Sequence, residues 1–249
     1  MSEKQILIIH PKDKTTSFLD KIKNHLIDSF KDDVHHFNIQ PNQKSHNECL
    51  ERITSHTGSG LIIFLGHGRT DKLFGSKGEL FDSAEFVSLE AKMESPEEYY
   101  NNDNFISKEN ASVFSGKKVF CLACNSNNKI AKYAIENGAK TFLGFGDIPT
   151  SKEEFQDDGM TNVSNDIVKA MKTELIYIIK KSLEYSISNS YNFEQLQNII
   201  HFLINQRISE YLITRKDYKE RYLLTDYLYQ LKKDLTVFGD KKIKLIASP

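Results

Sequence analysis

LIIFLGHG, residues 61–68, joins a run of five apolar residues to a Gly-His-Gly turn. KVFCLACNSN, residues 118–127, has the same plan: an apolar run ends at Ala123 and Cys124, and polar residues follow. Short apolar runs bounded by glycine or polar residues are typical of strands buried on both sides. The two stretches therefore predict two buried strands, each with a chemically active side chain just past its end.

Further strands and helices alternate on either side of these stretches. Three apolar runs predict strands and three amphipathic segments predict helices, at residues 5–10, 34–39 and 140–145 for the strands and 17–30, 46–57 and 127–137 for the helices. Strands that alternate with helices are joined by right-handed crossovers and form a parallel sheet. The predicted fold class is α/β, a three-layer sandwich with a mainly parallel central sheet.

Two regions interrupt this alternation. Residues 69–115 are polar and long for a connection, so we expect a loop that holds a short hairpin and a helix near 83–92. At about 160–235, three apolar stripes predict helices that pack on the sandwich, and no Pro/Gly/Ser-rich linker precedes them. Residues 1–249 are therefore expected to form one domain with a helix-rich C-terminal third, and KIKLI at 242–246 predicts a final strand.

Composition excludes several classes of function. The 33 basic and 34 acidic residues leave a net charge of −1, which disfavours direct binding of nucleic acid or of an anionic membrane. The sequence contains neither an apolar run of about 18 residues nor a secretory signal. Its cysteines, Cys49, Cys121 and Cys124, are too few for a disulfide framework. We expect a cytoplasmic protein.

His67 and Cys124 are the candidate catalytic pair. Both follow strands, and in open parallel sheets catalytic groups gather beyond the carboxyl ends of the strands. An imidazole can accept the proton of a thiol and return it to a leaving amine. Cys121 lies inside its strand and is expected to belong to the core.

Neighbouring residues supply the rest of the predicted site. A helix beginning near Asn127 would favour the Cys124 thiolate, with Asn125, Ser126 and Asn127 as candidate capping residues. The backbone N–H groups of Gly68 and Cys124 are the candidate oxyanion hole.

Together, LIIFLGHG and VFCLACNSN resemble the caspase-like peptidases of clan CD, most closely the CHAT branch and separase. GAKTFLG at 138–144 is similar to the next strand of CHAT domains, and LTVFGD at 235–240 is similar to their closing segment. The resemblance spans nearly the whole chain and implies the caspase-type sandwich.

The resemblance also implies a function. It implies a cysteine endopeptidase with His67 as general base, Cys124 as nucleophile, and Gly68 and Cys124 as oxyanion-hole donors. The substrate would be a protein or peptide cut after one preferred residue, and neither a metal nor an organic cofactor would be needed. A regulatory protein partner that gates the activity, and a setting in bacterial antiviral defence, are further expectations. Asp147 is expected either to line the specificity pocket or to cap the turn beside Pro149.

Departures from the family keep alternatives open. Metacaspases carry an acidic residue two positions before the cysteine, where this chain has Leu122, and the tryptophan common in CHAT domains is missing. The main alternative is a catalytically inactive caspase-fold module that binds proteins. A flavodoxin-like nucleotide binder lacks a matching glycine-rich loop, since Gly144-Phe145-Gly146 has no third glycine. A metal hydrolase with His67 as a ligand lacks ligand spacing.

Overall fold

A six-stranded sheet forms the centre of the computed structural model, which describes residues 5–56, 60–78, 88–157, 159 and 163–246. Its strands follow the order β2-β1-β3-β6-β7-β8, and every neighbouring pair is parallel except β7 and β8. Their bounds are Ile6–Pro11 for β1, Val34–Ile39 for β2, Leu61–Leu65 for β3, Lys118–Leu122 for β6, Thr141–Gly144 for β7 and Thr236–Gly239 for β8. The α/β class and the mainly parallel sheet are confirmed.

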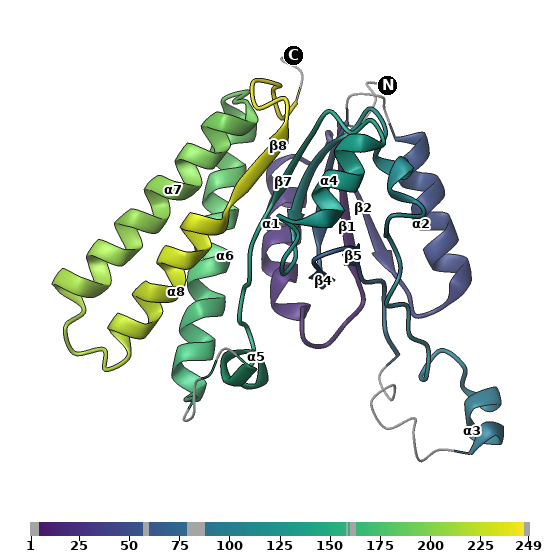
Figure 1. The fold of residues 1–249 in the computed structure, drawn as a ribbon, viewed down its shortest axis with the longest axis horizontal. Coiled ribbons are helices and arrows are strands. Elements are labelled where there is room, and N and C mark those ends of the chain that lie inside the picture. The colour runs from purple at the N-terminus through teal and green to yellow at the C-terminus, as the bar shows by residue number, and fades with distance from the viewer. Residues whose placement is uncertain (1–4, 57–59, 79–87, 158, 160–162, 247–249) are drawn as a thin grey trace.

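Helices cover both faces of the sheet, so the molecule has three layers (Figure 1). One face carries α1 Asp20–Ser29, α6 Asn165–Ser188, α7 Phe193–Ser209 and α8 Arg221–Asp234. The opposite face carries α2 Gln43–Ser55, α4 Lys129–Glu136 and the short 3-10 helix η3 Ala111–Phe114. Successive strand residues supply the two cores in turn: Ile62 packs under α2 and α4, whereas Ile63 packs under α1 and α6.

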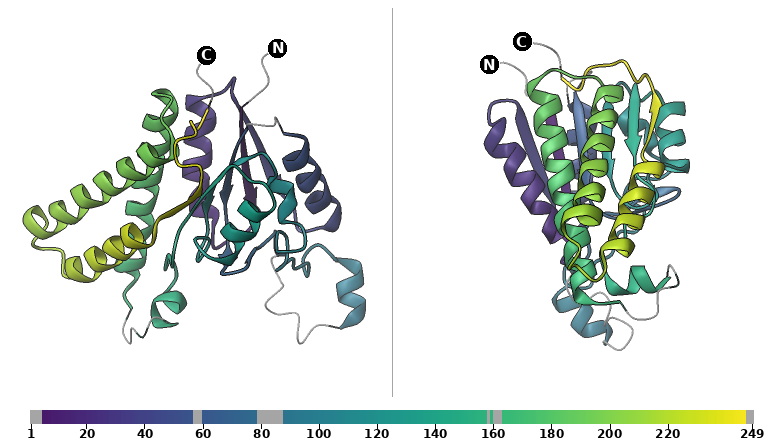
Figure 2. Two further views of the ribbon diagram at one scale, coloured as in Figure 1. Left: turned by 45° about the horizontal axis from the view of Figure 1, so that its top comes forward. Right: turned by 90° about the vertical axis from the view of Figure 1, so that its left-hand side faces the viewer.

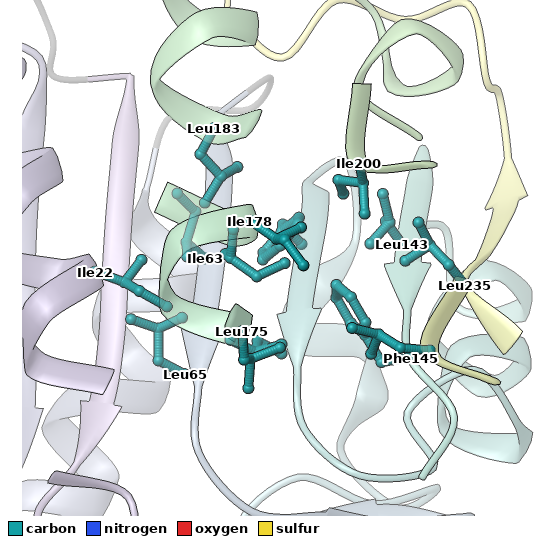
Figure 3. Close-up of a cluster of buried hydrophobic side chains, with 14 of the residues drawn as sticks. Ile22, Ile63, Leu65, Leu143, Phe145, Leu175, Ile178, Leu183, Ile200 and Leu235 are labelled. Carbon is teal, nitrogen blue, oxygen red and sulfur yellow. The ribbon is translucent and has the colours of Figure 1, made fainter. Parts of the chain in front are cut away.

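The helix-rich C-terminal third is a layer of the sandwich. Figure 3 shows Leu175 and Ile178 of α6 against Ile63 and Leu65 of β3. All four side chains are buried, and each such burial contributes about 1.5–3 kcal/mol. Figure 2 shows α6, α7 and α8 side by side over this face.

Capping side chains fix where these helices begin. The Ser164 hydroxyl accepts hydrogen bonds from two N–H groups in the first turn of α6. Asn192 and Gln195 form a capping box at the start of α7. The starts of α6 and α7 are therefore fixed by local side-chain hydrogen bonds.

The final strand predicted at 242–246 is wrong, and β8 lies within 235–240, the segment named above as similar to a closing segment. Residues 242–246 form no strand: Lys244 forms an isolated bridge with Asn192, and the Leu245 N–H donates to the Tyr191 carbonyl at 2.9 Å. β8 comes earlier, at Thr236–Gly239, because α8 returns the chain beside β7 and the two strands pair antiparallel. The 242–246 segment lies instead against the turn between α6 and α7.

The long connection after β3 contains small elements. β4 Gly68–Arg69 and β5 Lys72–Leu73 form the expected short hairpin, and α3 is Leu89–Glu94. The part of the predicted helix at 83–87 lies outside the described residues. Remaining elements are η1 Ser17–Leu19, α5 Lys152–Asp157 and the π-helical turn η4 Glu210–Thr214. Within the described ranges, no helix combines the length and apolar character that crossing a membrane requires.

Candidate active site

Strands β3 and β6 deliver His67 and Cys124 to the same edge of the sheet. The strands are parallel neighbours in which Leu65 pairs with Leu122, and the Gly66 N–H donates to the Leu122 carbonyl at 3.2 Å. His67 and Cys124 each follow two residues after this pair. Both line one cavity of about 20 Å³, which has room for about one water molecule.

The walls of this cavity come from four strand ends and from α6. The loop after β1 contributes Thr16 and Phe18, the loop after β7 contributes Ile148 and Thr150, and α6 contributes Leu175. Glu154 of α5 also lines it. Its carboxylate accepts hydrogen bonds from the Thr150 N–H at 2.6 Å and the Ser151 N–H at 3.0 Å, so its charge serves the start of α5.

A tight turn holds Cys124 beside the end of β7. Asn125 adopts a φ of 55°, in the left-handed region that asparagine tolerates better than most residues. Its N–H donates to the Gly146 carbonyl at 2.8 Å, and the Asn127 N–H donates to the Phe145 carbonyl at 3.0 Å. The turn is thus tied by its backbone to the neighbouring strand end, which fixes the position of the thiol.

Burial raises the pKa of the Cys124 thiol to about 12, and the negative charges of Glu154 and Asp147 add to the effect. The Sγ lies 3.6 Å from the Ile148 carbonyl oxygen, to which the thiol donates. The Cys124 thiol is therefore protonated at neutral pH in this conformation. The expectation of a stabilised thiolate is wrong for this state, because desolvation outweighs the backbone hydrogen bonds that lower the pKa.

The predicted caps of α4 are also wrong. α4 begins at Lys129, its N-cap is Asn128, and no side chain caps it. The Ser126 hydroxyl instead donates to the Cys121 carbonyl at 2.9 Å and accepts from the Phe145 N–H at 3.0 Å, which links β6 to β7. The Asn127 side chain donates to the Asp234 carbonyl at 2.7 Å. These residues hold the turn, which starts the helix two residues later than predicted.

His67 contacts two residues of the loop after β1. Its Nε2 lies 2.6 Å from Thr15 Oγ1 and 3.5 Å from Asp13 Oδ1. Both the backbone N–H and the hydroxyl of Thr15 donate to Asp13 Oδ1, at 2.7 and 2.5 Å. Burial alone would raise the pKa of Asp13, but the hydrogen bonds from His67 and Thr15 lower it well below its usual range. Asp13 is a carboxylate at neutral pH.

Sequence reasoning missed Asp13 and Thr15, although a signal was present. They follow the first apolar run, at the carboxyl end of a strand, where His67 and Cys124 were also found. Because β1 pairs with β3, the two loops meet at one edge. Applying the strand-end rule to every strand would have found these residues.

Gly68 lies against the turn that holds Cys124, whereas Asp147 does not line the cavity. A Cβ built on Gly68 would be 3.0 Å from the Ala123 Cβ and 3.1 Å from the Cys124 carbonyl oxygen, so a larger residue would press on the turn. Asp147 is exposed and is not among the described residues that line the cavity. Its charge nevertheless acts on the thiol.

Of the three cysteines, only Cys124 is partly exposed. Cys49 is buried under the sheet and Cys121 lies inside β6, as expected. Burial raises the pKa of Cys49 to about 12 and that of Cys121 still further. Cys124 is therefore the one cysteine residue that is not fully buried, and it also lines the cavity.

The described part of the chain contains no group of three or more His, Cys, Asp or Glu side chains placed to hold a metal ion. No protein-family model, curated protein or solved structure matches the chain. Any functional conclusion therefore depends on the geometry of the site.

Proposed function

We propose that the chain is a caspase-like cysteine endopeptidase of the CHAT type, with Cys124 as nucleophile and His67 as general base. One observation carries the proposal: the two side chains, 57 residues apart in sequence, line a single cavity at the carboxyl edge of the sheet. A thiol and an imidazole that line one cavity are the pair of groups that nucleophilic catalysis by cysteine uses.

The proposed reaction has two stages. The His67 imidazole takes the Cys124 proton as Sγ attacks the peptide carbonyl carbon, and the backbone N–H groups of Gly68 and Cys124 receive the developing oxyanion. The C–N bond breaks, and the amine leaves with the proton from His67. Water, deprotonated by His67, then attacks the thioester and releases the carboxylic acid and the free thiol.

The resting site supports gated activity. The thiol is protonated, the cavity has room for one water, and apolar side chains such as Phe18 and Leu175 form its walls. A substrate side chain therefore has to displace part of this wall before the reaction begins. We assign that opening to a regulatory protein partner, and we assign the enzyme to the cytoplasm, where a thiol nucleophile stays reduced.

The inactive binding module remains the second candidate. The same closed cavity and protonated thiol favour it, because both properties also suit a site that no longer reacts. The two candidates differ in one respect: only the enzyme requires the Cys124 sulfur.

Mapping new protein N-termini in bacterial cells that express the natural chain tests the proposal. We expect a set of new termini that share a residue type before the cut and that disappear in Cys124→Ala. The matched control is Cys49→Ala, which removes a buried thiol remote from the cavity and should keep the set. Identical termini with the natural chain and with Cys124→Ala would overturn the enzyme and favour the binding module.

A further inference from the structure

The Asp13, Thr15 and His67 side chains form a chain of hydrogen bonds that runs from the loop after β1 to the loop after β3. Asp13 is 11% exposed in its side chain and His67 is 28% exposed. Thr15 lies between them at the surface, with its Oγ1 2.5 Å from the carboxylate and 2.6 Å from the imidazole. The three groups together determine where the proton of a neutral His67 lies.

The hydroxyl of Thr15 has one proton to donate and lone pairs to accept. Asp13 is ionised and therefore only accepts, so the Thr15 proton points to Asp13 Oδ1. The side of Thr15 Oγ1 that faces His67 Nε2 then carries a lone pair. A contact of 2.6 Å is favourable only if Nε2 bears the hydrogen.

The other ring nitrogen of His67 is available for chemistry. In the described part of the chain, no protein group bonds to Nδ1, whereas Nε2 is held twice. A neutral imidazole with its proton on Nε2 presents a basic lone pair at Nδ1. When Nδ1 gains a proton, the Asp13 charge stabilises the imidazolium through Thr15.

We propose that Asp13 and Thr15 are positioning residues that hold His67 in the Nε2–H tautomer, so that Nδ1 exchanges the proton with Cys124. The role of Nδ1 rests on the proposed peptidase function, whereas the tautomer does not. Thr15 acts through its hydroxyl, and Asp13 acts through Thr15 and through its own 3.5 Å contact with His67 Nε2. Neither residue needs to touch the substrate.

A purely structural role for the same contacts, the ordering of the loop after β1, can be tested separately from control of the His67 tautomer. The Thr15 N–H that donates to Asp13 Oδ1 closes an Asx turn, which orders the loop whether or not His67 is present. Thr15→Val keeps this backbone bond and the side-chain shape but removes the hydroxyl. Thr15→Ser keeps the hydroxyl. Only the hydroxyl distinguishes the two roles.

The test uses the full chain with ¹⁵N-labelled histidine and reads the His67 tautomer from its two ring nitrogen shifts, assigned with His67→Gln. We expect the Nε2–H form in the natural chain and in Thr15→Ser, and a mixture of tautomers in Thr15→Val. Ser17→Ala, which removes another hydroxyl of this loop, should leave the spectrum unchanged. An Nδ1–H form in the natural chain, or equal spectra for Thr15→Val and Thr15→Ser, overturns the relay.

A second readout separates this inference from the peptidase proposal. We measure the rate at which iodoacetamide alkylates Cys124 at pH 7, with folding checked by thermal melting. We expect the rate to fall about tenfold in Thr15→Val and to recover in Thr15→Ser, because a wrong tautomer withholds the base. Suppose that the tautomer is Nε2–H but that Cys124 is alkylated at the same rate in His67→Gln as in the natural chain. Then the hold of Asp13 and Thr15 on His67 stands, and the pairing of His67 with Cys124 fails.

Discussion

Two carboxylates of this molecule are held by hydrogen bonds in opposite ways. Glu174 of α6 is 1% exposed and accepts from Arg207 Nε at 2.6 Å, from Arg207 Nη2 at 2.9 Å and from the Tyr211 hydroxyl at 2.8 Å. Asp13, at the sheet edge, is held by an exposed hydroxyl and by an imidazole that opens into a cavity. The Glu174 carboxylate is fully hydrogen-bonded, whereas the bonds of Asp13 lead to the His67 imidazole, which can still exchange a proton.

The difference separates a buried structural ion pair from a partly exposed cluster that we propose to be catalytic. The guanidinium of Arg207 stays charged, and its bond to Glu174 raises its pKa further. Burial raises the pKa of Tyr211 to about 12, and the Glu174 carboxylate adds to that rise. Arg207 and Tyr211 therefore stay protonated throughout the physiological range. Their hydrogen bonds to Glu174 hold α6 against α7 and η4. The cluster of Asp13 differs because the Nδ1 of its imidazole has no bonding partner in the described part of the chain.

The largest predicted effect is on catalysis at the cluster of Asp13, Thr15 and His67. In His67→Gln we expect kcat/KM for a peptide that contains a mapped cleavage site to fall by about 10²–10⁴-fold, the usual contribution of a general base. The free energy of unfolding, measured with urea, should change by less than about 1 kcal/mol because the ring is partly exposed. Cleavage at the natural rate would remove His67 from the mechanism.

The cluster of Glu174, Arg207 and Tyr211 should show the opposite pattern, in which a substitution lowers stability. Glu174→Ala leaves Arg207 without its bidentate partner, and breaking a buried pair costs about 3–5 kcal/mol of unfolding free energy. Glu184→Ala is the matched control on the same helix, because its partners Lys181 and His25 are more exposed and the loss should stay below about 1 kcal/mol. Equal losses in the two variants would contradict the assignment of Glu174 as the structural anchor.

These contrasts also explain what the sequence could predict. The bounds of β2 and β3 agree with the prediction because each segment is a run bordered by polar or glycine residues. The apolar pattern missed β8, and only the family resemblance pointed to a closing segment at 235–240. TVFG becomes a strand by pairing with β7, whose Gly144 lies 92 residues before its partner Thr236. Local pattern cannot supply a pairing that the intervening helices create.

The candidate site shows the same limit. The strand-end rule named His67 and Cys124, and their shared cavity follows from the adjacency of β3 and β6. Asp13 was not named, because its link to His67 depends on the pairing of β1 with β3 and on one rotamer of Thr15. The high pKa of Cys124 was also missed, since burial by the loop after β7 has no signature in the residues around the thiol.

The acid range offers a third test of the comparison. The pKa of Asp13 is lower in the folded chain than its unfolded value of about 3.9, so its contribution to stability is present above that value and is lost as pH falls through the folded value. We expect the natural chain to exceed Asp13→Asn by about 1–2 kcal/mol at pH 7, a difference that shrinks steadily below about pH 4. Urea unfolding at pH 7, 5 and 3 measures it, and a constant difference would show that the carboxylate is not the source.

The smallest predicted effect concerns the close approach of Gly68 to the turn that holds Cys124. A Cβ here would lie 3.1 Å from the Cys124 carbonyl oxygen, so Gly68→Ala should displace that turn by a few tenths of an ångström and cost about 0.5–1 kcal/mol. Gly138→Ala is the matched control: it strains a φ of 94° beside Ser115 at the other end of α4 and should cost about 1–2 kcal/mol. Because Gly68, unlike Gly138, lies against the Cys124 backbone, kcat should fall in Gly68→Ala alone. Equal kcat values in both variants would contradict the expected dependence of catalysis on the position of this turn.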